Sequence, residues 1–315
     1  MQIGKYKYLV AATQLFLIAG SCYLLYSKLS TPQLNVALKA ALQALAPWHL
    51  VILLGLSICF WCLDTNVWRI ILSPFTSVSF GKALRYNMIA QTAGILTPLL
   101  VGEYGLRSVL LRNEVDSRQN TLVTLAYQLM KVATRIIIGV LAGLLFMLSG
   151  AWSLISLVVT VGLLIGGAIA IKRLLKAVAK NKYANKLIKG ANSLDFSQLR
   201  TKRALLPASL LFLAFSLQTA LLIFWLDNKG DFFQVWLMVI LTYSITSFLP
   251  PLSIFDPLAK SAVGALLYTE FASPNVMLFA FTATWVINRG VPAIISSLLF
   301  KRFSNRLQET ARSTM

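Results

Sequence analysis

Residues Thr97–Arg107, TPLLVGEYGLR, put two charged side chains into an otherwise hydrophobic region of the chain. Pro98 and Gly102 both weaken a continuous helix, so a helix is expected to break here. Glu103 and Arg107 follow the break four residues apart, on one face of one helical turn. They form either an ion pair that caps a turn or part of a site where free peptide groups meet an anion.

The composition of the 315-residue chain is that of a membrane protein. Hydrophobic residues make up 57% and charged residues 12%, whereas soluble domains carry about 25% charged residues. Several hydrophobic runs reach or approach the roughly 20 residues that cross a bilayer. The net charge of +19, from 29 Lys and Arg against 10 Asp and Glu, would suit a nucleic-acid-binding protein. No RNA-binding motif or zinc-finger spacing supports that function, and basic loops facing anionic lipid explain the charge.

Six hydrophobic runs predict membrane-spanning helices, and two further hydrophobic regions are interrupted. The predicted spans are Tyr8–Tyr26, Trp48–Leu63 (with Leu72 as an alternative end), Thr121–Leu148, Ser153–Ile171, Ala204–Leu226 and Val276–Phe300. Prolines and charged residues interrupt the regions Phe80–Leu111 and Phe232–Phe271. Each interrupted region is predicted to be a re-entrant broken hairpin, with a kinked span as the alternative.

Basic residues divide unequally between the two sides of the predicted membrane. One side holds 22 of them: Lys5 and Lys7, six between Arg69 and Arg118, ten between Lys172 and Arg203, and four between Lys301 and Arg312. The other side holds only Lys28, Lys39 and Lys229. The positive-inside rule therefore predicts a multi-pass membrane protein with both termini in the cytoplasm.

Six spans fit that orientation only if each interrupted region leaves on the side where it enters. The first would enter from the cytoplasm and the second from outside, which is the pattern of an inverted repeat and points to a transporter's binding site. The chain is then a single all-α transmembrane domain with halves at 1–171 and 204–300. Residues 172–203 form a basic cytoplasmic linker or a surface helix, and residues 301–315 form a cytoplasmic tail.

Cations also occur deep inside the predicted spans. Lys131 and Arg135 are four residues apart on one helix face, and two like charges there repel each other. They need an acid or an anion nearby, for which Glu103 is the best candidate, or else they snorkel to the interface. Arg289 lies in the middle of the last span beside a glycine, where it is expected to meet Asp256 or an anion. We expect these cations to line a polar cavity.

The second interrupted region is expected to break at Pro250 and Pro251. Asp256 directly precedes Pro257, so it can cap the helix that this proline begins. Asp256 and Lys260 are again four residues apart and are expected to pair.

No metal or cofactor site is predicted. Cys59 and Cys62 have a CxxC spacing, but they lie in a hydrophobic run and are interpreted as free thiols. A zinc site needs about four ligands, and His49 is the only histidine of the chain. His49 is interpreted as a structural residue near the membrane interface.

The sequence resembles the flippase-like family of integral membrane proteins that includes the transmembrane domain of lysylphosphatidylglycerol synthases and AglD-like archaeal dolichol-sugar proteins. The resemblance rests on four elements: Asn66–Arg69, the Pro-x-x-x-Gly-Glu-x-x-x-Arg pattern over Pro98–Arg107, the pair Leu249–Pro250, and Arg289 ahead of Pro292. It implies an inner-membrane protein that moves lipids or lipid-linked precursors between leaflets. This chain has Lys131 and Arg135 in the region where the family has acids, which favours an anionic substrate.

The expected function is translocation of an anionic or phosphate-bearing membrane lipid, without enzymatic activity and without a cofactor. The expected substrate-binding residues are charged and lie in the breaks or the spans: Glu103, Arg107, Lys131, Arg135, Asp256, Lys260 and Arg289. The expected structural breaks are Thr97, Pro98, Gly102, Pro250, Pro251 and Pro257. The alternatives are a membrane-embedded glycosyltransferase that uses a polyprenyl-phosphate sugar, and an accessory subunit.

Overall fold

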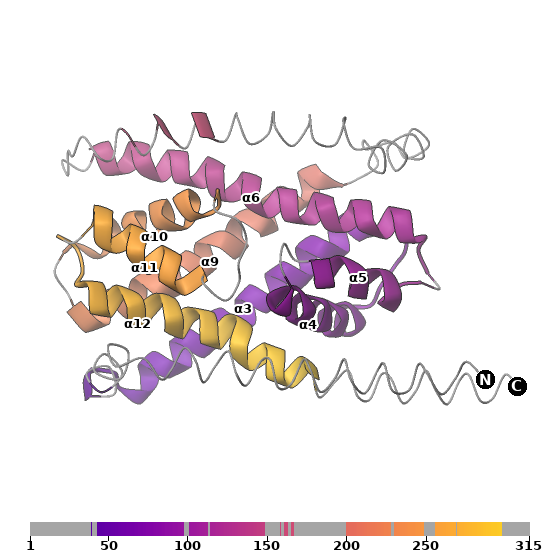
Figure 1. Ribbon diagram of the computed structural model, residues 1–315, viewed down its shortest axis with the longest axis horizontal. Coiled ribbons are helices and arrows are strands. Elements are labelled where there is room, and N and C mark those ends of the chain that lie inside the picture. The colour runs from indigo at the N-terminus through magenta and orange to yellow at the C-terminus, as the bar shows by residue number, and fades with distance from the viewer. Residues whose placement is uncertain are drawn as a thin grey trace, which may run out of the picture.

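The computed structural model describes residues 43–97, 101–112, 114–148, 200–227, 230–248, 256–268 and 270–297, together with Lys39 and five positions between 158 and 166. All regular structure in these residues is helical (Figure 1). The helices are α3 (Pro47–Leu72), α4 (Phe80–Leu96), α5 (Val101–Leu110), α6 (Ser117–Leu148), α9 (Thr201–Asp227), α10 (Phe232–Thr246), α11 (Asp256–Leu267) and α12 (Pro274–Trp285). The π-helical turn η3 (Val286–Gly290) continues α12 into a helix that runs to Ser297.

Four of these helices are long and apolar enough to cross a membrane: Pro47–Leu72, Gln119–Leu148, Thr201–Asp227 and Pro274–Ser297. They correspond to the second, third, fifth and last predicted spans, and they indicate a membrane protein. Helix α3 continues to Leu72, the alternative end given for the second predicted span. The predicted spans Tyr8–Tyr26 and Ser153–Ile171 and most of the basic segment 172–203 lie outside the described residues.

Helices α3 and α9 form an antiparallel pair at the centre of the fold. Near one end Trp48 packs against Trp225, with ring centroids 5.6 Å apart. Farther along, the Gln218 side chain donates a hydrogen bond of 2.8 Å to the Leu53 carbonyl. At the other end the buried Ala204 of α9 belongs to the same hydrophobic cluster as the last turns of α3. The start of α9 therefore lies beside the end of α3.

Helix α5 folds back antiparallel along α4, as predicted for the first interrupted region. The Thr97 hydroxyl joins the two helices, because it donates to the Ala93 carbonyl (2.8 Å) and accepts from the Gly102 amide (2.7 Å). A Cβ atom at Gly102 would lie 2.5 Å from the Ala93 carbonyl oxygen, so only glycine fits this turn. Pro98 lies outside the described residues.

The two ends of the α4–α5 hairpin lie together. Lys82 near the start of α4 forms an ion pair of 2.5 Å with Glu114, just beyond α5. Because α4 has 17 residues, its length is about 25 Å, less than the roughly 30 Å hydrocarbon core of a bilayer. The hairpin leaves the bundle at the end where it enters.

Helices α10 and α11 form a second interrupted pair, and its two ends also lie together. The Asp231 carboxylate caps α10 by accepting from the Phe233 amide at 3.0 Å. A Cβ atom at Gly230, before α10, would lie 3.2 Å from the Phe271 ring beyond α11. The carboxylate of Asp227 at the end of α9 accepts a hydrogen bond from the Ser273 amide at the start of α12. The predicted breaks at Pro250 and Pro251 lie outside the described residues, and α11 begins at Asp256 with Pro257 next.

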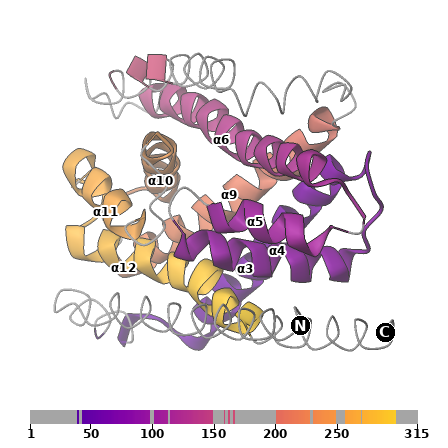
Figure 2. The ribbon, with the colours of Figure 1, turned by 45° about the vertical axis from the view of Figure 1, so that its right-hand side comes forward.

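The two hairpins occupy opposite ends of the long helices. The α4–α5 hairpin adjoins the end of α3 and the start of α6, whereas the α10–α11 hairpin adjoins the end of α9. Since α3 and α9 are antiparallel, these are opposite ends, and Figures 1 and 2 show the two hairpins on opposite sides of the molecule along α6. This placement is the one that the inverted-repeat hypothesis requires. The repeat itself and the membrane orientation stay predictions.

Candidate functional site

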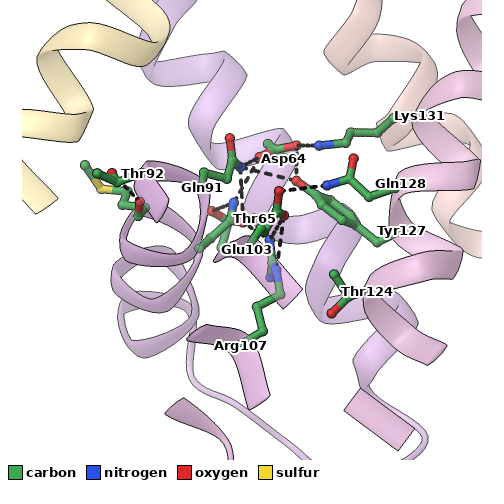
Figure 3. A network of polar contacts seen from close by, with 12 residues as sticks. Asp64, Thr65, Gln91, Thr92, Glu103, Arg107, Thr124, Tyr127, Gln128 and Lys131 are labelled. Atoms are coloured by element: carbon green, nitrogen blue, oxygen red, sulfur yellow. Dashed lines mark hydrogen bonds and ion pairs between the residues drawn. The ribbon is translucent and has the colours of Figure 1, made fainter. Parts of the chain in front are cut away.

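A buried polar network joins α3, α4, α5 and α6, and Asp64 of α3 lies at its centre (Figure 3). One oxygen of the fully buried Asp64 carboxylate accepts from the Tyr127 hydroxyl at 2.6 Å and lies 3.5 Å from the Lys131 ammonium. The other oxygen accepts from the Asn87 amide at 3.0 Å and from the Gln91 amide. The carboxylate therefore has four polar partners from two helices, which is what an ionised acid requires when it is buried.

Glu103 and Arg107 form the ion pair that their spacing predicts, and both are buried within the same network. The Arg107 guanidinium donates to Glu103 at 2.9 Å and 3.2 Å, and to the Asn87 side-chain oxygen at 2.5 Å. The second Glu103 oxygen accepts from Gln128 at 2.8 Å. The guanidinium also lies 4.4 Å from the centre of the Trp68 ring, a cation–π contact. Arg107 was counted with the basic connections in the sequence, but its side chain is 0% exposed.

A small cavity lies beside the Asp64 end of this network, between α3, α6, α9 and η3. It is lined by Phe60, Asp64, Lys131, Thr134, Arg135, Ala208, Leu211, Phe212, Phe215 and Arg289. Its volume of about 10 Å³ holds about one water molecule. Three cations and one acid therefore share this cavity.

The two cations of α6 lie differently within the cavity. Lys131 is buried, its ammonium lies 3.9 Å from the centre of the Tyr127 ring, and it faces Asp64. The snorkelling alternative is therefore wrong for Lys131. Arg135 is half-buried, and its guanidinium donates no hydrogen bond to any side chain or carbonyl within the described ranges. Asp64, Asp256 and Arg289 act on it electrostatically.

Arg289 reaches the network from the π-helical turn η3. Its guanidinium donates to the side-chain oxygen of Gln91, which in turn donates to Asp64. It also lies 5.8 Å from the centre of the Phe60 ring, on the wall of the cavity. π-Helical turns are rare and occur often at functional sites, because the extra residue redirects a side chain.

The second hairpin contributes an ion pair outside the cavity. Lys260 and Asp256 pair as their spacing predicts, and the Lys260 ammonium lies 4.7 Å from the centre of the Tyr243 ring. Neither residue lines the cavity. The hairpin approaches α6 through Ser244, whose hydroxyl donates to the Arg135 carbonyl at 2.8 Å.

The structure thus divides the predicted site residues among three places. Three of them, Lys131, Arg135 and Arg289, line the cavity. Glu103 and Arg107 are buried in the adjoining polar network. Asp256 and Lys260 form their ion pair on α11. One predicted partner was wrong, because Lys131 pairs with Asp64 and not with Glu103. Arg289 hydrogen-bonds to Gln91 and not to Asp256, and its other expected partner, an anion, stays a prediction. In both cases the observed partner is on α3 or α4, which helix packing brings next to α6 and η3.

Sequence reasoning missed Asp64, the acid at the centre of the network. Asp64 directly follows Leu63, the nearer of the two predicted ends of the second span, and it was not selected as a charge inside the membrane. With the alternative end at Leu72, the same rule that selected Lys131 selects Asp64. Asn87 and Gln91 carry no charge, and only their four-residue spacing on an apolar helix marks them.

His49 has the structural role that was predicted, since its Nδ1 accepts from the Ala46 amide at 2.8 Å at the start of α3. Cys59 and Cys62 are free and exposed. No group of three or more His, Cys, Asp or Glu side chains suited to a metal ion occurs among the described residues. Comparison of the chain with protein-family models, with curated proteins and with solved structures found no match.

Proposed function

We propose that this protein moves an anionic lipid, or a phosphate-bearing lipid-linked precursor, between the leaflets of a membrane. The observation that carries the proposal is the charge of the small cavity beside Asp64, called the central cavity below. Among the described residues that line it, three are cations (Lys131, Arg135 and Arg289) and one is an acid (Asp64). In this proposal the cavity receives the headgroup while the acyl or prenyl chains stay in lipid.

The excess of positive charge favours an anionic headgroup. Asp64 compensates one cation, so two positive charges remain in a site surrounded by apolar helices. Uncompensated charge in such surroundings is costly, and an anion removes that cost by pairing with it. Arginine suits phosphate in particular, because its planar fork donates two parallel hydrogen bonds to one group. Arg135, which has no hydrogen-bond partner among the described side chains, is the cation most available to do so.

The cavity in this conformation is too small for a headgroup. With room for about one water molecule, it corresponds in our proposal to a closed conformation of the transport cycle. Two hairpins that enter from opposite ends support an alternating-access mechanism, in which each hairpin controls the path to one side. The sequence has no P-loop motif for ATP, so we propose that a lipid or ion gradient drives the movement.

The positions of the motif residues support membership in the flippase-like family. Trp68 and the Gly-Glu-x-x-x-Arg pair, 35 to 39 residues later in the chain, meet in one contact network. Arg289, from the last span, joins the same network through Gln91. Residues that carried the resemblance as separate segments thus lie together, and we propose the family on that basis.

Reconstitution into liposomes tests the proposed function. Fluorescent phosphatidylglycerol and fluorescent phosphatidylcholine are followed across the bilayer by reduction of the exposed label, with rates normalised per protein molecule. Native protein is expected to speed phosphatidylglycerol movement more than phosphatidylcholine movement. Arg135→Ala is expected to lower that rate about tenfold or more, which is the effect of losing one charged hydrogen bond.

The matched control is Arg85→Ala, which removes an exposed arginine of α4 that does not line the cavity. It is expected to keep the native rate. Equal rates for native protein and empty liposomes would refute lipid translocation and favour the accessory-subunit alternative. A rate that Arg135→Ala leaves unchanged would refute the central cavity as the headgroup site.

A further inference from the structure

A second and larger cavity lies at the end of α3 and the start of α9. Its volume is about 310 Å³, which is within the range of small-molecule sites, roughly 300–1,000 Å³. It is lined by Asn66, Arg69, Ile70, Ser73, Thr76, Ser77, Val78, Arg200 and Arg203. No acid lines it among the described residues, so its three arginines give it a strong positive charge.

The structure holds one of these arginines in position. The Nε of Arg69 donates to the Val78 carbonyl at 3.1 Å, and the guanidinium lies 5.7 Å from the centre of the Phe80 ring. Its two terminal nitrogens donate no hydrogen bond to a residue in the described ranges. They are therefore free to bind an acceptor in the cavity, without the entropy loss of ordering a mobile side chain.

The other two arginines come from the beginning of α9. Arg200 precedes the helix, and Arg203 lies in its first turn, so both lie at the positive end of the helix dipole. Thr76 and Ser77 add polar residues to the lining of the cavity, and Ile70 and Val78 add apolar ones. This combination is the chemistry that recognises a phosphate group carried by a molecule with an apolar part.

We propose that this cavity, defined by Arg69, Arg200 and Arg203, is a binding site for a phosphate group. It lies at the end of the fold that the loop charges predict to face the cytoplasm, and in the sequence Arg200 directly follows the basic segment 172–199. The site is distinct from the central cavity, because none of its lining residues lines the other. It does not depend on the proposed translocation. The phosphate is that of a lipid headgroup or that of free phosphate.

Binding to the full-length protein in detergent tests the site and identifies the source. The probes are inorganic phosphate, dioctanoyl phosphatidylglycerol and dioctanoyl phosphatidylcholine, each titrated by calorimetry. The triple variant Arg69→Gln/Arg200→Gln/Arg203→Gln is expected to weaken phosphatidylglycerol binding at least about a hundredfold, as several charged hydrogen bonds are lost. Binding of phosphatidylglycerol and not of inorganic phosphate assigns the site to a lipid headgroup; the reverse assigns it to free phosphate.

A matched control removes the same charge elsewhere. The triple variant Lys39→Gln/Arg85→Gln/Arg112→Gln neutralises three exposed residues that do not line the cavity. It is expected to bind as the native protein does. Equal weakening in both triple variants would overturn the site in favour of general surface charge, and native binding in the arginine triple variant would overturn it outright.

Arg69 also supports the turn after α3, so its loss can affect folding. The double variant Arg200→Gln/Arg203→Gln leaves Arg69 in place and is expected to lose about tenfold or more in affinity. Native affinity in this double variant would overturn the proposal even if the triple variant fails to fold. The central cavity is unchanged in all of these variants, so their transport rates report separately on the proposed function.

Discussion

The protein buries two clusters of charged side chains, the Glu103–Arg107 pair and the central cavity, and both adjoin α3 and α6. In the first, one acid meets one base at 2.9 Å, and the side chains are 3% and 0% exposed. Asn87 and Gln128 add hydrogen bonds to the pair, the Trp68 ring covers the guanidinium, and only the Nη1 nitrogen of Arg107 has no hydrogen-bond partner among the described residues. The pair is neutral and has little need of a ligand.

The central cavity differs in both charge balance and satisfaction of its polar groups. Asp64 is satisfied by four partners, but Lys131, Arg135 and Arg289 exceed it in charge. Lys131 lies 3.5 Å from Asp64, longer than a hydrogen bond, and Arg135 has no hydrogen-bond partner among the described side chains.

The comparison separates two reasons for charge inside a membrane protein. A neutral, buried pair that is hydrogen-bonded to Asn87 and Gln128 specifies the packing of α4, α5 and α6. In a cavity with excess positive charge, by contrast, part of that charge is not compensated by the protein and can be compensated by an anionic ligand. Substitutions in the first cluster should therefore change stability, and substitutions at Arg135 should change function.

The largest expected loss of stability follows from breaking the neutral pair. Arg107→Met leaves Glu103 buried without its cation, which costs about 3–5 kcal/mol in similar pairs. We expect a large fall in the unfolding free energy, measured by denaturation in mixed micelles.

The double variant Glu103→Gln/Arg107→Met tests whether the unpaired charge is the cause. It removes both charges and keeps an acceptor for Gln128, so it is expected to recover most of the lost stability. If the double variant is as unstable as the single one, the contact of Arg107 with Trp68 and not its pairing determines stability.

Removing Asp64, the one acid among the described residues that line the cavity, should have a smaller effect on stability and a clear effect on anion binding. Asp64→Asn keeps one acceptor but leaves Lys131 without its acid, at a cost of about 1–3 kcal/mol. The charge excess in the cavity then rises, so added dioctanoyl phosphatidylglycerol should raise the unfolding temperature more in the variant than in native protein. An equal rise in both would show that the cavity does not bind the anion.

Arg135→Gln is expected to change stability by only about 0.5 kcal/mol or less. The reason is that its guanidinium has no hydrogen bond to lose among the described side chains. The same variant is expected to lose most of its lipid transport. It therefore distinguishes a residue needed for transport from the Glu103–Arg107 pair, which is needed for stability. Thermal unfolding and liposome transport on one preparation measure both effects. A loss of stability as large as that of Arg107→Met would place Arg135 with the structural pair.

The sequence predicted most of the helical elements and the ion pairs within one helix. Hydrophobic runs gave the four described spans, and four-residue spacing gave the Glu103–Arg107 and Asp256–Lys260 pairs, because both depend on local geometry. The Thr97 and Gly102 break was also predictable from residue type.

Partners from different helices were not predictable in the same way. The contact between Lys131 and Asp64 joins residues 67 positions apart in the chain, and it depends on how α3 packs against α6. The choice of Glu103 as the partner of Lys131 was wrong because Glu103 is already neutralised within its own helix. Uncharged residues of the polar network, such as Gln91, which links Asp64 to Arg289, are hard to recognise in the sequence because they carry no charge.

The exposed ion pair Lys82–Glu114 shows how much burial contributes to the strength of an ion pair. Among the ion pairs compared, its loss is expected to lower the unfolding free energy least. Its distance of 2.5 Å is shorter than that of Glu103–Arg107, but its side chains are 42% and 26% exposed. Solvent screens such pairs, so Lys82→Gln is expected to cost about 0–1 kcal/mol, and less at high salt.

The pH dependence of this pair has a defined sign. The hydrogen bond to Glu114 raises the pKa of Lys82 above its ordinary value of 10.5. Its contribution is therefore fully present below pH 10.5 and is lost as the pH rises through the raised pKa. Native protein and Lys82→Gln should differ slightly in unfolding free energy at pH 7 and converge at strongly alkaline pH. A loss at pH 7 that approaches that of Arg107→Met would show that closing the α4–α5 hairpin, and not burial, determines the strength of these pairs.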